Sequence, residues 1–191
     1  MTLLSNWIFS VLLAIAPPSE KKGIESESQM KTRYEQIAKD MEETIKSSDP
    51  IFSGENKDLK LAALITSISF YESGFHKMVD NGKIRGDNGR SWCLMQINIG
   101  NSNVLIGTDE MKKWSGKDLV TDRKKCFKAG IEVIRNSFNK CHYLKDIDAL
   151  SAYTSGKCIV DEKKAQHRWL YAQNLIKKYE FPIKENIIKI D

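Results

Sequence analysis

The chain has 191 residues, of which 41% are hydrophobic and 29% are charged, with a formal net charge of +5. This size and balance fit one soluble globular domain and exclude a chain that is disordered throughout. The positive charge suits a polyanion, but without zinc-finger spacing, a basic arm or interleaved aromatic and basic residues we expect no nucleic-acid partner; an anionic cell wall would suit the charge as well.

An uncharged run, WIFSVLLAIA, fills positions 7–16. It is shorter than the roughly 20 residues that a helix needs to cross a bilayer, so we expect no stable membrane span. Two prolines and a polar segment follow it, which is typical of a secretory signal peptide cleaved after Ala14-Ile15-Ala16. Because no Lys or Arg precedes the run, a short anchor or a buried N-terminal segment is the alternative. We therefore predict a signal peptide over 1–16, a linker over 17–28 and one domain over 29–191.

Apolar residues recur at helical spacing in five stretches, which predict helices over 29–47, 58–73, 122–142, 146–153 and 161–179. Asp58 is the expected N-cap of the second helix and Gly74 its end. Apolar residues cover most of that helix, so it should be central. In the last helix we expect an inward face made of Ala165, Trp169, Leu170, Ala172, Leu175 and Ile176.

Between the second and third predicted helices, residues 76–92 contain Asn-Gly and Gly-Asp turn signals. This pattern predicts a small hairpin or irregular lobe. Together, the five helices and the lobe indicate an α+β fold that is predominantly α.

The chain has four cysteines and no C-x-x-C pair, and the cysteines are Cys93, Cys126, Cys141 and Cys158. An even number favours two disulfides in an oxidising compartment, the alternative being four free thiols in a cytoplasmic protein. Cys126 and Cys141 would be about 22 Å apart along one helix, whereas a disulfide needs Cα atoms within about 7 Å. Two pairings remain: 93–126 with 141–158, and 93–141 with 126–158. We favour the second, because an antiparallel helix 146–153 would return Cys158 toward Cys126.

Three separated motifs occur in order, and they are Glu72-Ser73, Cys93-Leu94-Met95-Gln96-Ile97 and Ala152-Tyr153-Thr154-Ser155-Gly156. In this order and spacing they resemble the catalytic domain of soluble lytic transglycosylases, goose-type-lysozyme-like enzymes that cleave peptidoglycan. That family has Glu-Ser, Gly-Leu-Met-Gln-Ile and Ala-Tyr-Asn-x-Gly. The resemblance covers roughly residues 59–179 and implies a lysozyme-like fold. Cys93 replaces the usual Gly, and Thr154 the usual Asn.

Glu72 ends an apolar helix, and glycosidic cleavage gives that position a chemical reason. The leaving oxygen needs a proton, so a carboxylic acid has to stay protonated near neutral pH. Desolvation among apolar neighbours and the negative end of the helix dipole both favour the protonated form. We therefore predict that Glu72 is the catalytic acid. The ordinary alternative is a solvated Glu paired with a lysine.

The resemblance implies that Glu72 works without a second carboxylate and without a cofactor. It would first protonate the leaving oxygen and then remove a proton from the sugar's own 6-hydroxyl, which leaves a 1,6-anhydromuramyl end. The Tyr153 hydroxyl would donate toward Glu72 and hold it in place. The motifs further imply a substrate-binding set, which consists of Ser73, Met95, Gln96, Asn98, Tyr153 and Thr154.

Asp80 and Asp87, in the turn-rich lobe, are the candidates for a second carboxylate, which would make the protein a hydrolytic muramidase. A non-catalytic glycan-binding or assembly protein is the alternative outside the enzymes. His76, His142 and His167 lack metal-ligand spacing, so we expect no metal. We expect an exported monomer, periplasmic or extracellular, whose partner is the peptidoglycan glycan strand.

Overall fold

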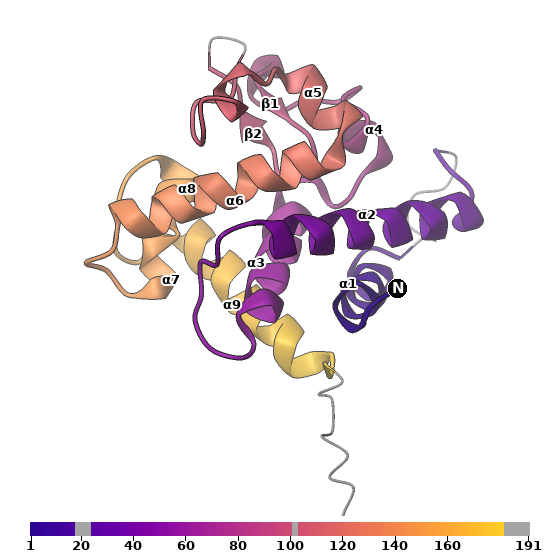
Figure 1. The fold of residues 1–191 in the computed structure, drawn as a ribbon, viewed down its shortest axis with the longest axis horizontal. Helices are drawn as coiled ribbons and strands as arrows, with labels where there is room; N and C mark the ends of the chain where they lie inside the picture. Colours follow the sequence, from indigo (N-terminus) through magenta and orange to yellow (C-terminus); the bar gives the residue numbers. More distant parts are fainter. Residues whose placement is uncertain (18–23, 101–102, 182–191) are drawn as a thin grey trace, which may run out of the picture.

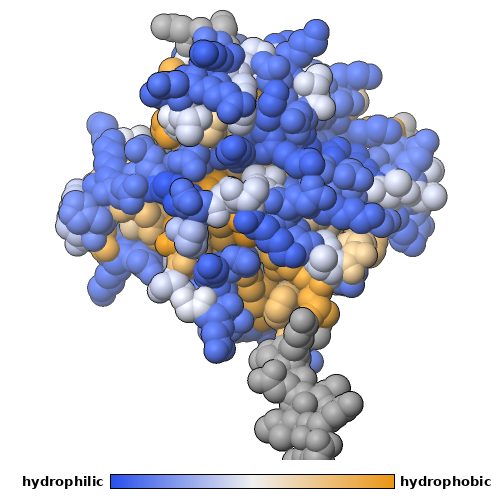
Figure 2. Space-filling model, viewed as in Figure 1, coloured by the Kyte–Doolittle hydropathy of each residue, from blue (hydrophilic) through white to orange (hydrophobic). Residues whose placement is uncertain are grey.

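The structure, a computed structural model, describes residues 1–17, 24–100 and 103–181. Helices dominate this part of the chain, and two short strands form one antiparallel sheet (Figure 1). The mostly helical α+β fold expected from the sequence is confirmed. The face shown in Figure 2 is largely hydrophilic, with apolar side chains gathered around α3 and α9 in its lower half.

The central helix is α3 (Lys57–Ser73), and its residues are buried almost without a break from Leu59 to Ser69. It packs against α9 (Lys163–Lys178) as well as against α1 and α2. Gly74 ends α3 in the left-handed conformation at φ 53°, as expected. The expected N-cap was wrong by two residues: Asn56 is the N-cap, and Asp58 lies in the first turn, where an acidic side chain suits the helix dipole.

The N-terminal segment forms helix α1 (Leu3–Ile15), which packs against α2 (Glu27–Ser47). Ile8, Val11 and Leu12 are fully buried in this contact. Helix α2 starts inside the segment predicted as a linker, of which residues 18–23 lie outside the described part. Among the described residues, no helix is long and apolar enough to cross a membrane.

Helix α6 (Arg123–Lys140) begins at its N-cap Asp122, and the chain then turns back through α7 (Asp146–Ala149) and α8 (Ser151–Ser155). The single helix predicted over 146–153 is therefore two short helices. On α9 the predicted inward face was wrong in one respect, because Leu170 is 46% exposed. The residues of α9 that are buried are Ala165, Arg168, Ala172 and Leu175.

The turn-rich lobe contains α4 (Lys77–Asp80), α5 (Gly116–Thr121), and the strands β1 (Ser91–Trp92) and β2 (Ile97–Asn98). Two 3-10 turns, η2 (Asp87–Gly89) and η3 (Met111–Lys113), complete it. In the hairpin, Ser91 pairs with Asn98 and Trp92 with Ile97. The hairpin thus lies at the C-terminal edge of the predicted lobe, residues 76–92, and extends beyond it to Asn98.

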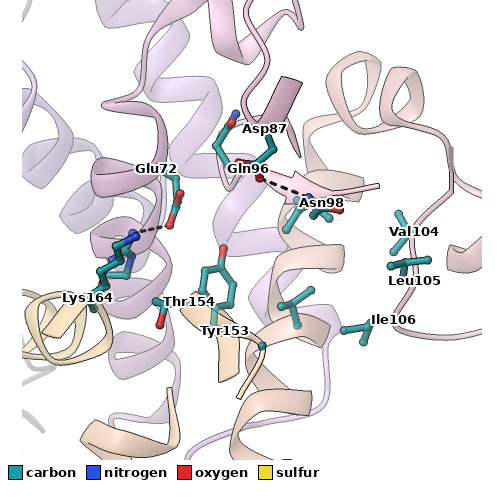
Figure 3. A pocket seen from close by; sticks show the side chains of 14 residues that line it. Glu72, Asp87, Gln96, Asn98, Val104, Leu105, Ile106, Tyr153, Thr154 and Lys164 are labelled. Carbon is teal, nitrogen blue, oxygen red and sulfur yellow. Dashed lines mark hydrogen bonds and ion pairs between the residues drawn. The ribbon is translucent and has the colours of Figure 1, made fainter. Parts of the chain in front are cut away.

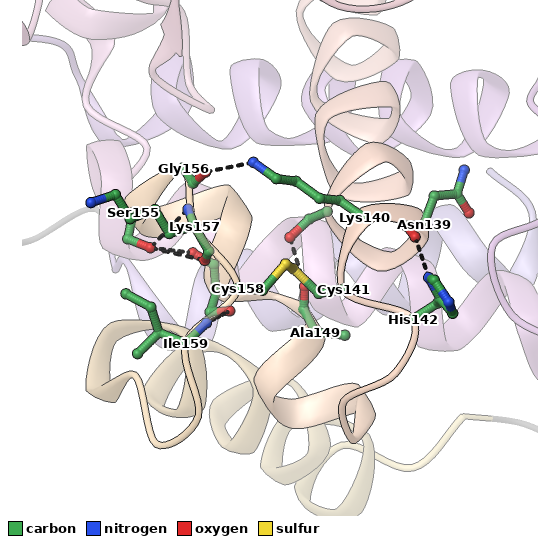
Figure 4. The surroundings of a disulfide bond; sticks show 12 residues. Asn139, Lys140, Cys141, His142, Ala149, Ser155, Gly156, Lys157, Cys158 and Ile159 are labelled. Atoms are coloured by element: carbon green, nitrogen blue, oxygen red, sulfur yellow. Dashed lines mark hydrogen bonds between the residues drawn. A yellow bond between two sulfur atoms is a disulfide. The ribbon is translucent and has the colours of Figure 1, made fainter.

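Two disulfides join Cys93 to Cys126 and Cys141 to Cys158, so the pairing that we favoured was wrong. Cys126 and Cys141 are not paired, as their places on α6 predicted. Helices α7 and α8 stay beside the C-terminal end of α6, where the Ser137 hydroxyl donates to the Ala149 carbonyl at 2.7 Å. Cys158 therefore returns to Cys141, as Figure 4 shows, and not to Cys126.

Candidate active site

A cleft of about 490 Å³ lies between the end of α3, the β1–β2 hairpin and helices α8 and α9. Figure 3 shows Glu72 and the Tyr153 ring directed into the same space. Six of the predicted site residues line it, and they are Glu72, Asp87, Gln96, Asn98, Tyr153 and Thr154. The other lining residues were not predicted, and they are Ile97, Val104, Leu105, Ile106, Val133, Gly156, Lys164 and Arg168.

Glu72 occupies the last turn of α3, and its side chain is 23% exposed toward the cleft. The Nη2 atom of Arg168 donates to its Oε1 atom at 2.6 Å. The sequence led us to expect a carboxyl shielded by apolar neighbours, and it gave no sign of a charged partner. Arg168, on α9, reaches the Glu72 carboxyl and forms an ion pair with it.

Arg168 is the main site residue that the sequence interpretation missed. Its side chain is only 10% exposed, and its Nη1 atom donates to the Lys164 carbonyl at 3.0 Å. Its Cζ atom lies 5.3 Å from the centre of the Tyr71 ring. The signal was available in the spacing, because residue 168 falls three after Ala165 and four before Ala172, on the buried stripe of α9.

The turn between β1 and β2 carries Gln96 into the cleft. Cys93 has φ 60° and Gln96 has φ 49°, both in the left-handed region. The Gln96 amide Nε2 donates to the Cys93 carbonyl at 3.0 Å, which closes the turn. A Cβ atom at Gly86 would lie 2.3 Å from the Gln96 Oε1 atom, so a side chain there would displace the Gln96 amide from this position.

The Cys93–Cys126 disulfide ties this turn to α6, at a position where the resemblance predicts glycine. We expect Cys93→Ala with Cys126→Ala to lose about 4 kcal/mol of unfolding free energy, because the bond closes a long loop. Cys93→Gly with Cys126→Ala should be about 1 kcal/mol more stable than that variant, since glycine adopts positive φ without strain. Urea denaturation of the two double variants measures the difference. Equal midpoints would show that the backbone at Cys93 is not strained.

Tyr153 lies in the cleft as predicted, but its predicted hydrogen bond was wrong. The hydroxyl donates to the Met95 carbonyl at 2.9 Å instead of to Glu72. Burial raises the pKa of Tyr153 above its usual range, and the negative charge of Glu72 adds to the effect. Tyr153 is thus a neutral donor that joins α8 to the Gln96 turn and lies within the electrostatic reach of Glu72.

Two predicted substrate-binding residues do not line the cleft. The Ser73 hydroxyl donates to the Ser69 carbonyl at 2.8 Å and accepts from the Phe75 N–H at 3.2 Å, so it closes the end of α3. The Met95 side chain is fully buried, and a Cβ atom at Gly130 would lie 2.1 Å from its sulfur. Ser73 shapes the helix end, and Met95 fills the core beneath the cleft.

Thr154 forms the cleft wall next to the start of α9. Its hydroxyl donates to Glu162 Oε2 at 2.6 Å, and the same carboxylate accepts from the Ala165 N–H at 2.7 Å. Burial opposes ionisation of Glu162, but the hydrogen bonds from Thr154 and from two backbone N–H groups outweigh it and hold the pKa below its usual range. Thr154 therefore anchors α8 to the N-cap of α9.

Asp87 lines the cleft on the side of the hairpin. Its carboxylate accepts from the Ser91 hydroxyl at 2.5 Å and from the Asn98 amide at 3.4 Å. The hydrogen bond from Ser91 is the main reason why the pKa of Asp87 lies below its usual range. Asp87 is accordingly an ionised carboxylate in the same cleft as Glu72.

Asp80, the other candidate for a second carboxylate, is not in the cleft. Its carboxylate is 7% exposed and pairs with Arg123 at 2.9 Å and with Arg33 at 3.5 Å. Arg123 also pairs with Asp40 on α2 at 2.7 Å. Asp80 therefore fastens the lobe to α2 and α6, which explains its burial without a catalytic role.

We expect Asp80→Asn to lower the free energy of unfolding by about 2 kcal/mol, because Arg123 keeps Asp40 and Arg33 keeps Glu25 but each loses its charged contact with Asp80. The matched control is Asp109→Asn, which removes a pair between Lys112 and a carboxylate that is 96% exposed. Urea denaturation should show the control within about 0.5 kcal/mol of the original protein. A similar loss for both variants would contradict the structural role of Asp80.

The cleft residues do not form a metal site, and no group of three or more His, Cys, Asp or Glu residues suited to a metal occurs in residues 1–17, 24–100 and 103–181. Comparison with curated proteins and with solved structures found no match. A family model described as the transglycosylase SLT domain matches residues 49–176, which include all three motifs and both walls of the cleft. The chain belongs to the transglycosylase SLT domain family.

Proposed function

We propose that this protein is a peptidoglycan lytic transglycosylase that cleaves the β-1,4 bond between N-acetylmuramic acid and N-acetylglucosamine. The observation that carries the proposal is the common cleft of Glu72, Gln96 and Tyr153, which come from three separated motifs of one chain. Because one chain supplies all three residues, a monomer suffices. The family match supports transglycosylase activity in general, and the bond that is cleaved and the products that form are part of our proposal.

In the first step, the protonated Glu72 carboxyl would give its proton to the glycosidic oxygen as the bond from that oxygen to muramyl C1 breaks. The substrate's acetamido group would help to stabilise the cationic C1. In the second step, the Glu72 carboxylate would take the proton of the muramyl 6-hydroxyl while O6 bonds to C1. The products are a free 4-hydroxyl and a 1,6-anhydro ring, no water is consumed, and Glu72 ends protonated as it began.

Four other cleft residues would bind and position the strand. Gln96 and Asn98 present amide groups on the hairpin side, which suit the hydroxyl and N-acetyl groups of a sugar. Thr154, on α8, lines the opposite side of the cleft, and its hydroxyl donates a hydrogen bond to Glu162. Leu105, which is 61% exposed, lies on the rim next to Ile106 and offers an apolar surface to a sugar ring.

A hydrolytic muramidase is a second candidate function, and Asp87 is the observation that favours it. This ionised carboxylate lines the same cleft and could activate a water molecule for attack on C1. Mass spectrometry of digested peptidoglycan separates the two reactions, since anhydro ends are lighter than reducing ends by one water. We expect anhydro ends from the original protein and from Asp87→Asn. Reducing ends that disappear in Asp87→Asn would establish hydrolysis instead.

Export is part of the proposal. Peptidoglycan lies outside the cytoplasm, and both disulfides fit an oxidising compartment. Residues 1–16 would direct the export, although their helix α1 also packs into the core. Sequencing the N-terminus of the exported protein decides whether it begins at Pro17, after cleavage, or retains residues 1–16.

A further inference from the structure

The ion pair between Arg168 and Glu72 is built into the fold and does not lie at its surface. Arg168 is 10% exposed and Glu72 23% exposed, and the guanidinium is held by the Lys164 carbonyl and by the face of the Tyr71 ring. Its Nε–H is buried and has no hydrogen-bond partner in the described structure. The guanidinium therefore contacts Glu72 through one nitrogen atom, Nη2.

Stability alone does not explain an arginine at this position. An apolar side chain would continue the buried stripe of Ala165, Ala172 and Leu175. Replacement of buried ion pairs by apolar residues is often neutral or stabilising, whereas Arg168 brings a buried N–H without a partner. The place of Arg168 against the proposed catalytic carboxyl points to a role in the reaction.

We propose that Arg168 is a positioning residue whose contact holds Glu72 in place in the saccharide-free protein and is given up when Glu72 takes up its proton. This inference rests on the proposed function of Glu72. The first step needs a proton on Glu72, and a neutral carboxyl no longer attracts a guanidinium. The contact would thus oppose the acid form before the reaction, and it would re-form as Glu72 loses its proton to the leaving oxygen.

The other groups around the cleft do not offer a substitute for Arg168. Lys164, one turn earlier on α9, lines the cleft with an exposed side chain, and Tyr153 on α8 is neutral. Asp87 on the hairpin side is negative, as is Glu162 at the start of α9, and Gln96 and Asn98 are uncharged. Among the described residues that line the cleft, Arg168 is thus the positively charged residue in contact with Glu72, and this contact would break and re-form during the reaction.

The test compares pH–activity profiles of the original protein with those of Arg168→Met and Arg168→Lys on purified glycan strands. A nearby positive charge favours the ionised form of a carboxyl group, so its removal lets the acid form persist to higher pH. In Arg168→Met, the pH above which kcat/KM falls should rise, and kcat at the optimum should drop about tenfold because Glu72 is less well held. Arg168→Lys should keep the original profile, with an intermediate kcat.

Lys164→Met is the matched control, because it removes a positive charge from the same cleft and leaves the contact to Glu72 in place. Its profile should move by less than about a third of the shift in Arg168→Met. Profiles of Arg168→Met and the original protein that coincide would overturn the proposal. So would equal shifts in Arg168→Met and Lys164→Met, since they would reflect the charge of the cleft and not the contact.

A second measurement keeps this inference separate from the proposed function. The ¹³C signal of the Glu72 carboxyl, assigned by its loss in Glu72→Gln, can be followed with pH in protein that has no turnover. The change from carboxylate to acid should occur at higher pH in Arg168→Met than in the original protein. Identical curves would overturn the role of Arg168, whereas a shifted curve without any cleavage of glycan would overturn only the proposed function. Arg168→Gln, which also removes the positive charge but keeps a polar side chain, serves both measurements if Arg168→Met does not fold.

Discussion

Glu72→Gln is expected to lower the cleavage of peptidoglycan by a factor of about 10³, which is the range for losing a general acid and base. The amide can still accept a hydrogen bond from Arg168, so the shape of the cleft should persist. Gln cannot supply the proton for the leaving oxygen or remove the proton of the 6-hydroxyl. The measurement is the release of soluble fragments from purified sacculi, with co-sedimentation to record binding.

The matched control is Glu132→Gln. Glu132 on α6 is 25% exposed and pairs with Arg135 at 3.2 Å, so it resembles Glu72 in burial and charge partner but does not line the cleft. The control should cleave at the original rate within about twofold. If Glu72→Gln cleaved as fast, another residue would be the acid. If the original protein bound sacculi without cleaving them and Glu72→Gln bound equally, the protein would be a glycan-binding protein.

Removal of residues 1–16 is expected to abolish cooperative folding of the chain that starts at Pro17. Ile8, Val11 and Leu12 are fully buried and Trp7 is 4% exposed. At about 2 kcal/mol for each such side chain, their loss is comparable with the whole stability of a typical domain. The Tyr34 hydroxyl would also lose the Ala16 carbonyl, to which it donates at 2.9 Å. Circular dichroism during heating should show no sharp transition.

A point substitution tests the same contact without shortening the chain. Val11→Asp places a charge in the contact between α1 and α2 and should lower the melting temperature by more than 10 °C, at about 4 °C or less for each kcal/mol. Ser10→Asp, on the exposed side of α1, is the matched control and should melt near the original temperature. A chain from Pro17 that folds and melts like the original would instead support residues 1–16 as a removable signal peptide.

The local sequence pattern was enough to predict most of the helices and several of the residues that line the cleft. The apolar run from Leu59 to Ile68 predicted a central α3, and Gly74 predicted its end. The three motifs predicted which loops meet at Glu72, because each motif carries its own turn or helix end. Six of the proposed site residues do line one cleft.

The features that were missed depend on tertiary contacts. The spacing places Arg168 on the buried stripe of α9, but its contact with Glu72 depends on the packing of α9 against α3, and a charged residue on a helix is ordinarily solvated. The disulfide pairing depended on how far α7 and α8 turn back along α6, which local spacing does not determine. Tyr153 donates to Met95 because the turn at Cys93 and Gln96 presents that carbonyl, and positive φ at non-glycine residues has no clear sequence signal.

The two disulfides fix the segments that form opposite sides of the cleft. Cys93–Cys126 fastens the turn that carries Gln96, and Cys141–Cys158 closes the segment that contains Tyr153 and Thr154. A newly synthesised chain whose cysteines are still reduced lacks both of these covalent cross-links. If the protein acts on the cell wall as proposed, both sides of its cleft would be fully fixed only in an oxidising compartment, which is where the wall lies.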